Sequence, residues 1–261
     1  MKAICLHDRD EIAAVLRRDP LLHLYAIGDL DDFFWPSTNW YALAEGDQIR
    51  QIILCYAVAP LLILHALTRE RVEEMRALLR AVLYLLPRRI YTHLSPGLVT
   101  TFADDYRIEP HGEHDKMALA DRARLDAVDT SSVERLEAAD LPAIEALYAA
   151  SYPGNWFDPR MIETGHYYGV RQGGALLSIA GVHVYSPQYR VAALGNITTH
   201  PEARGRGLAT LATARLCQEL LKTVDHIGLN VRADNASAIT CYTKLGFTKT
   251  GSYEEYALDL M

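Results

Sequence analysis

The chain has 261 residues, of which 50% are hydrophobic and 23% are charged, the balance of a folded globular protein. Its formal net charge is −7, and neither half is basic: 15 basic and 20 acidic residues occur up to Thr130, and 11 and 13 after it. Nonspecific binding to nucleic acid or to an anionic membrane needs concentrated Lys and Arg, so we expect neither partner.

Four cysteines lie far apart and show no metal-ligand or disulfide spacing, so we expect free thiols and no metal site. The first residues carry too few apolar side chains before charges begin to form a signal peptide. The longest apolar run, residues 52–67, is shorter than the roughly 20 residues that span a bilayer. We therefore predict a cytoplasmic protein.

Apolar periodicity predicts alternating helices and strands in the first half. The longest predicted helix follows Thr68, a residue type that caps helices, and stops at Pro87. In chain order, we predict helices at 8–18 and 21–30, strands at 40–44, 50–57 and 61–67, a helix at 69–86, a strand at 90–94, a helix at 96–106 and a strand at 114–120.

The second half repeats this order. We predict a strand at 133–137, a helix at 140–150, strands at 166–170 and 175–184, a strand at 191–199, a helix from about 207, a strand at 227–232, a helix from 235 and a terminal strand. Two passes through a similar series indicate a tandem duplication, although no residue-level repeat is visible. The sequence turns polar between residues 121 and 130, where we place the boundary: domains at 1–125 and 126–261.

The segment from Val191 to Leu221 reads as a strand, a turn containing Arg204-Gly205-Arg206-Gly207, and a helix. The first turn of a helix presents free N–H groups and the positive end of the dipole, and glycines let an anion approach the backbone. With two arginines added, this turn predicts a site for a phosphorylated ligand. It matches neither GxGxxG nor a nucleotide-hydrolysing loop, which needs Lys-Ser/Thr after the second glycine.

The pattern Arg-x-x-Gly-x-Ala at Arg204, Gly207 and Ala209, followed by Asn235-x-x-Ala238-x-x-x-Tyr242-x-x-x-Gly246-Phe247, resembles the GNAT superfamily of N-acyltransferases. The resemblance covers roughly the C-terminal half. It implies an α/β (α+β) fold of two tandem GNAT-like domains, each a mixed, mostly antiparallel sheet flanked by helices. It also implies acetyl-CoA or another acyl-CoA as co-substrate, direct transfer in a ternary complex, and a small-molecule or peptide amine as acceptor; a homodimer is possible.

The resemblance assigns the coenzyme to the turn and to the strand before it. Backbone N–H groups of 205–209 would hold its pyrophosphate, and the strand edge at 197–199 would pair with its pantetheine arm. Asn235 would lie near the pantetheine and can also cap its helix. Gly195, inside the strand, indicates either a bulge or close packing by a neighbouring side chain. The cofactor-binding residues so predicted are Ile197, Thr198, Thr199, Arg204, Gly205, Arg206, Gly207, Leu208, Ala209, Thr210 and Asn235.

Two residues are candidates for catalysis. By resemblance, Tyr242 is the acid that protonates the departing thiolate, although buried tyrosines are also common core residues. The strand 191–199 contains no acid, so the general base is open: His183 is the first candidate because histidine titrates near neutral pH, and it can equally be structural. His200, Glu254 and Glu255 are weaker candidates, and a water-mediated or base-free route remains open.

Aromatic loops and acidic clusters give weaker signals. Trp156 and Phe157 follow the first helix of the second half, where relatives of this family select the acceptor, or they belong to the core. Asp29, Asp31 and Asp32 are either a cation or ammonium site or a solvated helix end.

The first half lacks glycines at the corresponding turn and places Glu70 and Glu73 there, so we expect it to bind no cofactor and to serve as a wall of the substrate cleft. The missing strand acid keeps an alternative open, a noncatalytic acyl-CoA-binding or regulatory module. A site for another phosphorylated ligand is a third.

Overall fold

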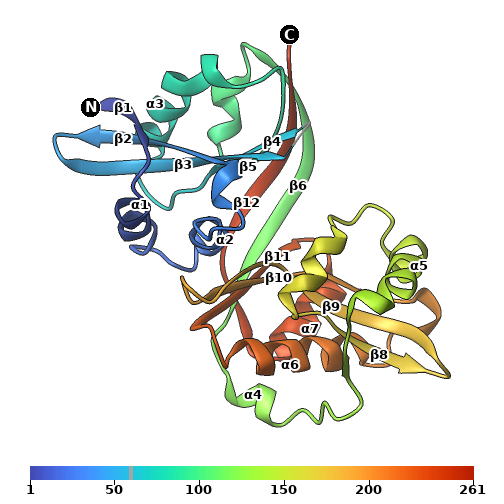
Figure 1. Cartoon of the computed structure of the whole chain (residues 1–261). Coiled ribbons are helices and arrows are strands. Elements are labelled where there is room, and N and C mark those ends of the chain that lie inside the picture. The colour runs from blue at the N-terminus through green and yellow to red at the C-terminus, as the bar shows by residue number, and fades with distance from the viewer. Residues whose placement is uncertain (59–60) are drawn as a thin grey trace. The chain divides into compact units, whose positions relative to one another are not determined.

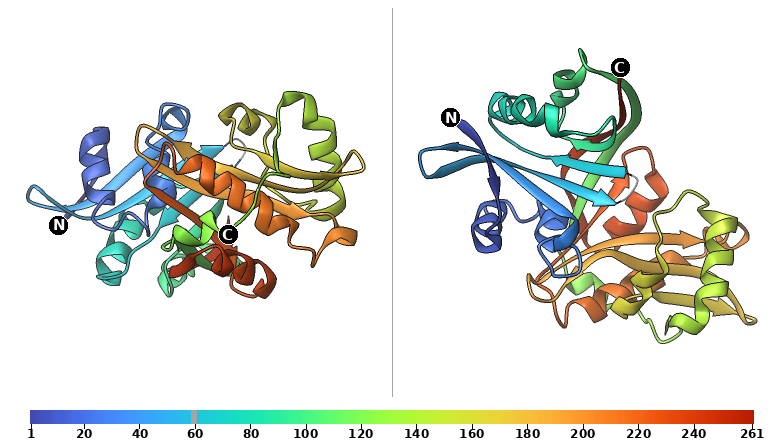
Figure 2. Two further views of the ribbon diagram at one scale, coloured as in Figure 1. Left: turned by 90° about the horizontal axis from the view of Figure 1, so that it is seen from below. Right: turned by 45° about the horizontal axis from the view of Figure 1, so that its top comes forward.

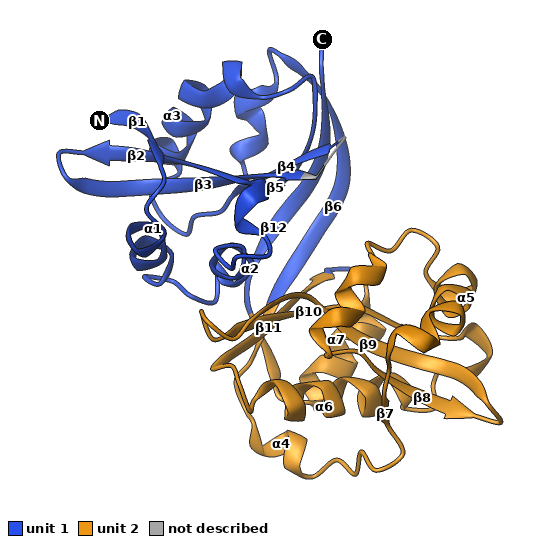
Figure 3. Ribbon diagram, viewed as in Figure 1, with its two compact units in different colours: residues 1–116, 232–234, 250–261 blue, residues 117–231, 235–249 orange. Residues whose placement is uncertain are grey.

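The computed structural model describes residues 1–58 and 61–261; residues 59 and 60, inside the apolar run at 52–67, lie outside this description. The chain forms two compact units (Figure 3). Unit 1 comprises residues 1–116, 232–234 and 250–261, and unit 2 comprises 117–231 and 235–249. The sequence predicts one division at 125/126, whereas unit 1 ends its first segment at Lys116 and also takes the end of the chain.

Unit 1 is a mostly antiparallel sheet with helices. Its strands, in spatial order, are β1 (Lys2–Leu6), β2 (Thr38–Glu45), β3 (Gln48–Val58), β4 (Leu61–Ala66), β5 (Arg89–Leu94), β12 (Phe247–Leu260) and β6 (Tyr106–Leu119), the last two continuing into unit 2. Only the β4–β5 pair among those with a described register is parallel. The helices are α1 (Arg9–Leu16), α2 (Leu24–Gly28) and α3 (Val72–Val82), with 3₁₀ turns at Trp35–Ser37, Leu83–Leu85 and Leu98–Phe102.

An amphipathic stripe fixes α3 on the sheet of unit 1. Met75, Leu78 and Leu79 are fully buried at helical spacing. They pack with Leu64 of β4 and Ile90 of β5 in one hydrophobic cluster. Side chains on alternate positions of these strands, such as His65 and His93, therefore point to the opposite face.

Three predictions for the first half are wrong in detail. The helix expected from residue 69 begins at Val72, because Thr68 Oγ1 donates to the Glu70 carbonyl and Arg71 takes a left-handed conformation (φ 59°). The helix expected at 96–106 is only a 3₁₀ turn, Leu98–Phe102, and β6 begins at Tyr106 rather than 114. The strand β1 was not predicted, because its few apolar residues show no clear period.

Unit 2 has the spatial strand order β11 (His226–Arg232), β10 (Val191–Thr199), β9 (Ala175–Ser186), β8 (Tyr168–Gln172) and β7 (Glu134–Arg135). The β10–β11 pair is parallel and the others are antiparallel. Its helices are α4 (Ala123–Asp126), α5 (Leu141–Ser151), α6 (Leu208–Leu220) and α7 (Ala236–Lys244), with 3₁₀ turns at Ala138–Asp140, Pro159–Thr164 and Pro201–Ala203. The elements predicted for this half are confirmed, with ends that move by a few residues.

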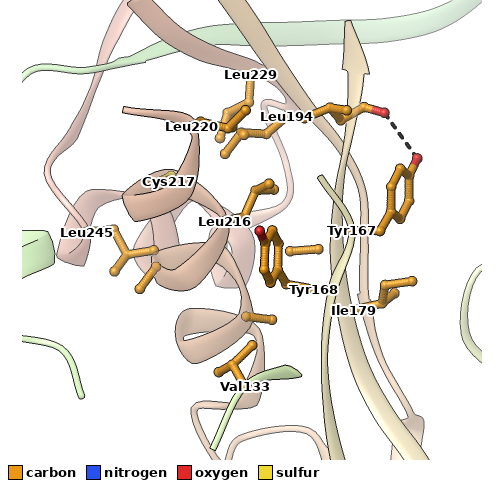
Figure 4. Packing of buried hydrophobic residues seen from close by; sticks show 14 of the residues in the cluster. Val133, Tyr167, Tyr168, Ile179, Leu194, Leu216, Cys217, Leu220, Leu229 and Leu245 are labelled. Carbon is orange, nitrogen blue, oxygen red and sulfur yellow. Dashed lines mark hydrogen bonds between the residues drawn. The ribbon is translucent and has the colours of Figure 1, made fainter. Parts of the chain in front are cut away.

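Helices cover both faces of the unit 2 sheet, α6 on one face and α5 on the other (Figures 1 and 2). Leu216, Cys217 and Leu220 of α6 belong to one buried cluster with Leu194 and Leu229 of the two parallel strands, and Figure 4 shows Leu220 beside Leu194 and Leu229. All five are essentially inaccessible to solvent, so burial of this apolar stripe holds the start of α6 against the end of β10.

Among the described residues, no helix combines the length and apolar character that crossing a membrane would require.

Candidate active site

The two parallel strands of unit 2, β10 and β11, are paired only over the first half of β10. Register pairs join β10 and β11 from Val191↔His226 to Leu194↔Leu229, and within the described residues none follows. Strand β10 nevertheless continues to Thr199, its other edge paired with β9 through Thr198↔Ile179 and Thr199↔Ser178. The edge of residues 195–199 that faces β11 is therefore open to an extended ligand that supplies backbone-like hydrogen bonds.

A turn with two left-handed glycines leads from this edge into α6. Gly205 and Gly207 have φ of 75° and 78°, and a Cβ at either position would meet nothing within 4 Å. Gly207 is the N-cap of α6, and no side chain of the described residues caps the helix there. The first turn thus presents unsatisfied N–H groups beside an exposed, uncrowded backbone, and it carries no acidic residue.

The flanking arginines belong to the same surface. Arg204 Nε and Nη2 lie 3.4 Å from the carbonyl oxygens of Thr199 and Ser151, and Arg206 donates to Gln172 Oε1 at 2.6 Å. Both side chains are exposed. Two cations and a helix N-terminus at one place favour an anionic ligand with several negative charges.

The second helix of the predicted motif adjoins this turn. Thr210 Oγ1 in the first turn of α6 lies 3.2 Å from Cys241 Sγ on α7, and the next residue is the buried Tyr242, whose ring is 6.1 Å from that of Phe247. Asn235 caps α7, since its Oδ1 accepts from the Ala238 N–H at 3.2 Å, which confirms the predicted cap. The structure therefore brings the turn and the residue next to Tyr242 together.

Two consecutive β-bulges distort the middle of β9 and β10. The register passes from Ala193↔Val184 to Leu194↔Val182, so His183 is an extra residue in β9. It then passes from Gly195↔Gly181 to Thr198↔Ile179, which sets Asn196 and Ile197 of β10 against the single residue Ala180 of β9. A bulge redirects side chains and increases twist, and these two bring His183 and Asn196 to the same point of the sheet.

Glycine at paired positions lets two rings lie directly on the backbone. A Cβ on Gly195 would be 1.6 Å from His183 Cδ2, and one on Gly181 would be 2.2 Å from Tyr167 Cε1. Both alternatives considered for Gly195, a bulge and close packing, therefore hold. Burial lowers the pKa of His183 from its ordinary 6.5, an effect that the neighbouring Asn196 side chain opposes.

Residues 132–247 match the acetyltransferase (GNAT) family model. The open strand edge and the glycine turn both lie inside this matched segment, and its sheet and helices match GNAT folds.

Individual GNAT relatives agree. The chain is 33% identical over 107 residues to mycothiol acetyltransferase of Tsukamurella paurometabola, covering 40% of this chain and 37% of the relative. It is 33% identical over 97 residues to N-alpha-acetyltransferase RimI of Mycobacterium tuberculosis, covering 35% and 57%. It therefore spans about a third to somewhat over half of these curated relatives.

A solved tandem GNAT protein from the clavulanic acid biosynthesis pathway has the same fold over nearly the whole chain: TM-score 0.56, 16% identity, and coverage of 99% of this chain and 98% of that one. At this identity the likeness concerns the fold alone. It supports a tandem arrangement of two GNAT-like units.

Unit 1 lacks the features that open the site of unit 2. Its parallel strands stay paired to their ends, from Leu62↔Ile90 to Ala66↔Leu94, and the Ser95 N–H continues the ladder to the Ala66 carbonyl at 3.0 Å. The first turn of α3 carries Glu73 and Glu74, whose carboxylates pair with Arg76 at 3.1 Å and Arg50 at 3.3 Å. In place of an open turn and a free strand edge, unit 1 has ion-paired glutamates and a closed strand pair here.

The aromatic loop before β8 lies beside the bulge. Trp156 is half exposed, and its carbonyl is 3.4 Å from Asn196 Nδ2. The Phe157 ring packs against Tyr148 and Tyr167, with centroid distances of 5.0 and 5.7 Å.

The other candidate residues of the sequence have partners of their own. His200 Nδ1 accepts from the Glu202 N–H, and Glu254 and Glu255 belong to unit 1, where Glu255 accepts hydrogen bonds from Tyr91 and Tyr253.

The three aspartates at 29–32 do not form one site. Asp29 is buried and desolvation raises its pKa to about 8, whereas Asp32 pairs with Arg9 at the surface. In the described part of the chain, no group of three or more His, Cys, Asp or Glu is placed to hold a metal ion.

Sequence reasoning missed Tyr148, Tyr167 and Asn196, which surround the bulge. The available signal was the pair of glycines inside adjacent strands, since a strand glycine often marks a bulge or a close approach.

Proposed function

We propose that this protein is an acyl-CoA-dependent N-acyltransferase whose unit 2 binds acetyl-CoA or a related acyl-CoA and transfers the acyl group directly to an amine. The observation that carries the proposal is the parting of β10 and β11 beside a glycine turn that opens α6. An acyl-CoA has the two matching parts, a diphosphate for the turn and an extended amide-containing arm for the strand edge.

In this proposal, different residues of unit 2 bind the coenzyme, orient the thioester and transfer protons. The N–H groups of 205–209 hold the diphosphate with Arg204 and Arg206, and the open edge at 197–199 orients the arm and donates an N–H to the thioester carbonyl oxygen, where negative charge develops. The amine nitrogen attacks the carbonyl carbon and the C–S bond breaks. His183 takes the amine proton and Tyr242 gives its phenolic proton to the sulfur.

His183 suits the role of base because its depressed pKa leaves the imidazole neutral at pH 7. We propose that Trp156 and Phe157 contact the acceptor. Peptide and small-molecule amines are both candidates, and one relative is named an N-alpha-acetyltransferase.

We propose further that unit 1 is a degenerate copy that does not bind the coenzyme. The continuous β4–β5 pairing and the glutamates at the start of α3 support this assignment. A binding stoichiometry of one acyl-CoA per chain is expected in calorimetry, and a stoichiometry of two would contradict it.

The proposal is tested by incubating the protein with acetyl-CoA and a panel of amines while released thiol is titrated. The panel contains peptide α-amines, lysine side chains and small-molecule amines. Acceptor-dependent thiol release is expected. Tight acetyl-CoA binding without any release would favour the noncatalytic module, and calorimetry in which a nucleotide binds as tightly as CoA would favour a different phosphorylated ligand.

A matched pair of variants localises the coenzyme. Arg204→Glu reverses a charge beside the glycine turn of α6, and Arg71→Glu reverses one at the equivalent N-cap of α3. We expect only Arg204→Glu to weaken CoA binding. Equal effects of the two variants would place the coenzyme elsewhere.

A further inference from the structure

Asn196 adopts a backbone conformation that its surroundings must hold in place. Its φ is 54°, in the left-handed region that non-glycine residues rarely occupy inside a strand. The residue is 3% exposed, and its carbonyl accepts a hydrogen bond from Tyr148 Oη at 2.8 Å. Its side-chain Nδ2 donates to Tyr167 Oη at 3.0 Å, and that hydroxyl donates to the Val182 carbonyl at 3.0 Å. Both ends of the residue are therefore anchored by buried tyrosines.

The side-chain oxygen of Asn196 has no hydrogen-bond partner among the described residues. This Oδ1 atom is buried, and Nδ2 of the same amide is committed to Tyr167. An unsatisfied buried acceptor is costly and calls for an explanation. The bulges place the His183 imidazole in this neighbourhood, against the backbone of Gly195, one residue before Asn196.

The direction of a pKa effect agrees with this placement. Asn196 raises the pKa of His183 while burial lowers it. An amide raises the pKa of an imidazole when its oxygen accepts a hydrogen bond from the protonated ring. Burial and the side chain of Asn196 are the causes of the pKa shift of His183.

We propose that Asn196 is a positioning residue for His183: its Oδ1, oriented by the hydrogen bond from Nδ2 to Tyr167, receives an imidazole N–H and stabilises the ring once His183 has taken a proton. This inference rests on the proposed function. This role explains both the left-handed backbone of Asn196 and the lack of a hydrogen-bond partner for its Oδ1. A positive charge that forms on the His183 imidazole away from solvent needs an acceptor already oriented toward the ring.

Three variants test the proposal. Asn196→Gly tolerates the left-handed backbone and removes the side chain, and Asn196→Asp also tolerates it and keeps an oxygen while adding a charge. Tyr148→Phe is the matched control, because it removes a hydrogen bond to the backbone of Asn196 and leaves its side chain untouched. The His183 ring is titrated by NMR, with His183→Gln identifying its resonance among the ten histidines.

We expect the His183 pKa to fall in Asn196→Gly, to rise in Asn196→Asp and to stay unchanged in Tyr148→Phe. The acidic limb of the pH–rate profile should move in the same directions, and kcat of Asn196→Gly should fall by roughly tenfold to a hundredfold, less than complete loss of a general base. CoA affinity should not change.

The outcomes separate the two proposals. If the His183 pKa is the same in all three variants, the positioning role is overturned, whatever the enzyme does. If the pKa moves as expected and no amine releases thiol, the His183–Asn196 coupling stands and the proposed function fails. If Asn196→Gly does not fold, Asn196→Asp alone still decides, because an unmoved pKa beside a new carboxylate would contradict the contact.

Discussion

Gly195→Ala is the substitution that most directly tests whether the bulges serve catalysis. The new Cβ would lie 1.6 Å from His183 Cδ2, 2.2 Å from Nε2 and 2.4 Å from Cγ, whereas real Cβ contacts essentially never fall below 3.0 Å. The ring must therefore move by about 1.4 Å to relieve the closest contact alone. Because Gly195 of β10 is paired with Gly181 of β9, the backbone at Gly195 has little freedom to move away from the ring.

The magnitude follows from the displacement. A misplacement of about 1 Å can cost on the order of a hundredfold in rate, and removal of a general base about 10²–10⁴-fold. We expect kcat for thiol release to fall by about a hundredfold, with the KM for acetyl-CoA nearly unchanged because the turn at 204–210 is untouched. Overpacking of this kind costs about 1–3 kcal/mol, which lowers the melting temperature and still allows folding.

Gly169→Ala is the matched control for overpacking. Its Cβ would meet Leu176 Cδ1 at 2.6 Å and Leu136 Cδ1 at 3.0 Å, in the core of the same unit and away from the bulges. It should lose comparable stability in thermal unfolding and retain far more of its kcat. Equal kcat values for the two variants would refute the assignment of His183 to the reacting centre.

Three further predictions concern charge. Reversing both Arg204 and Arg206 to Glu should weaken CoA binding by roughly tenfold or more at low ionic strength, and added salt should shrink the difference in calorimetry. For His183, whose pKa is lowered from 6.5, activity should be lost only as pH falls below about 6.5, and His183→Gln should lose this limb of the pH–rate profile. Asp29→Asn should stabilise unit 1. The pKa of this buried acid is raised from 3.8 to about 8 in the folded protein, so the free energy of unfolding falls as pH rises between these values. In urea unfolding, the variant should therefore gain about 4 kcal/mol near pH 7 and little at pH 4. An Asp29→Asn gain that does not depend on pH would contradict this reasoning.

The part of the site that sequence predicts well is local. The strand at 191–199, the glycine turn and α6 follow from periodicity and from the left-handed angles that Gly205 and Gly207 supply. The Asn235 cap and the left-handed Gly246 (φ 95°) are likewise decided within a few residues. Each depends on steric limits and hydrogen bonds inside one short segment, which is why residue types alone reveal them.

Tertiary structure decides what depends on register between distant strands. The bulges appear only when β9 is aligned with β10, and they determine that His183 lies on Gly195 and near Asn196. The parting of β10 and β11 is again a property of the pair. The last strand joins unit 1 because Glu254 pairs with Leu94, about 160 residues earlier, a choice that no local pattern encodes. A shift of one residue in any of these pairings would turn the side chains to the opposite face. Sequence by itself therefore determined the glycine turn, and only the assembled sheet decided which groups surround His183.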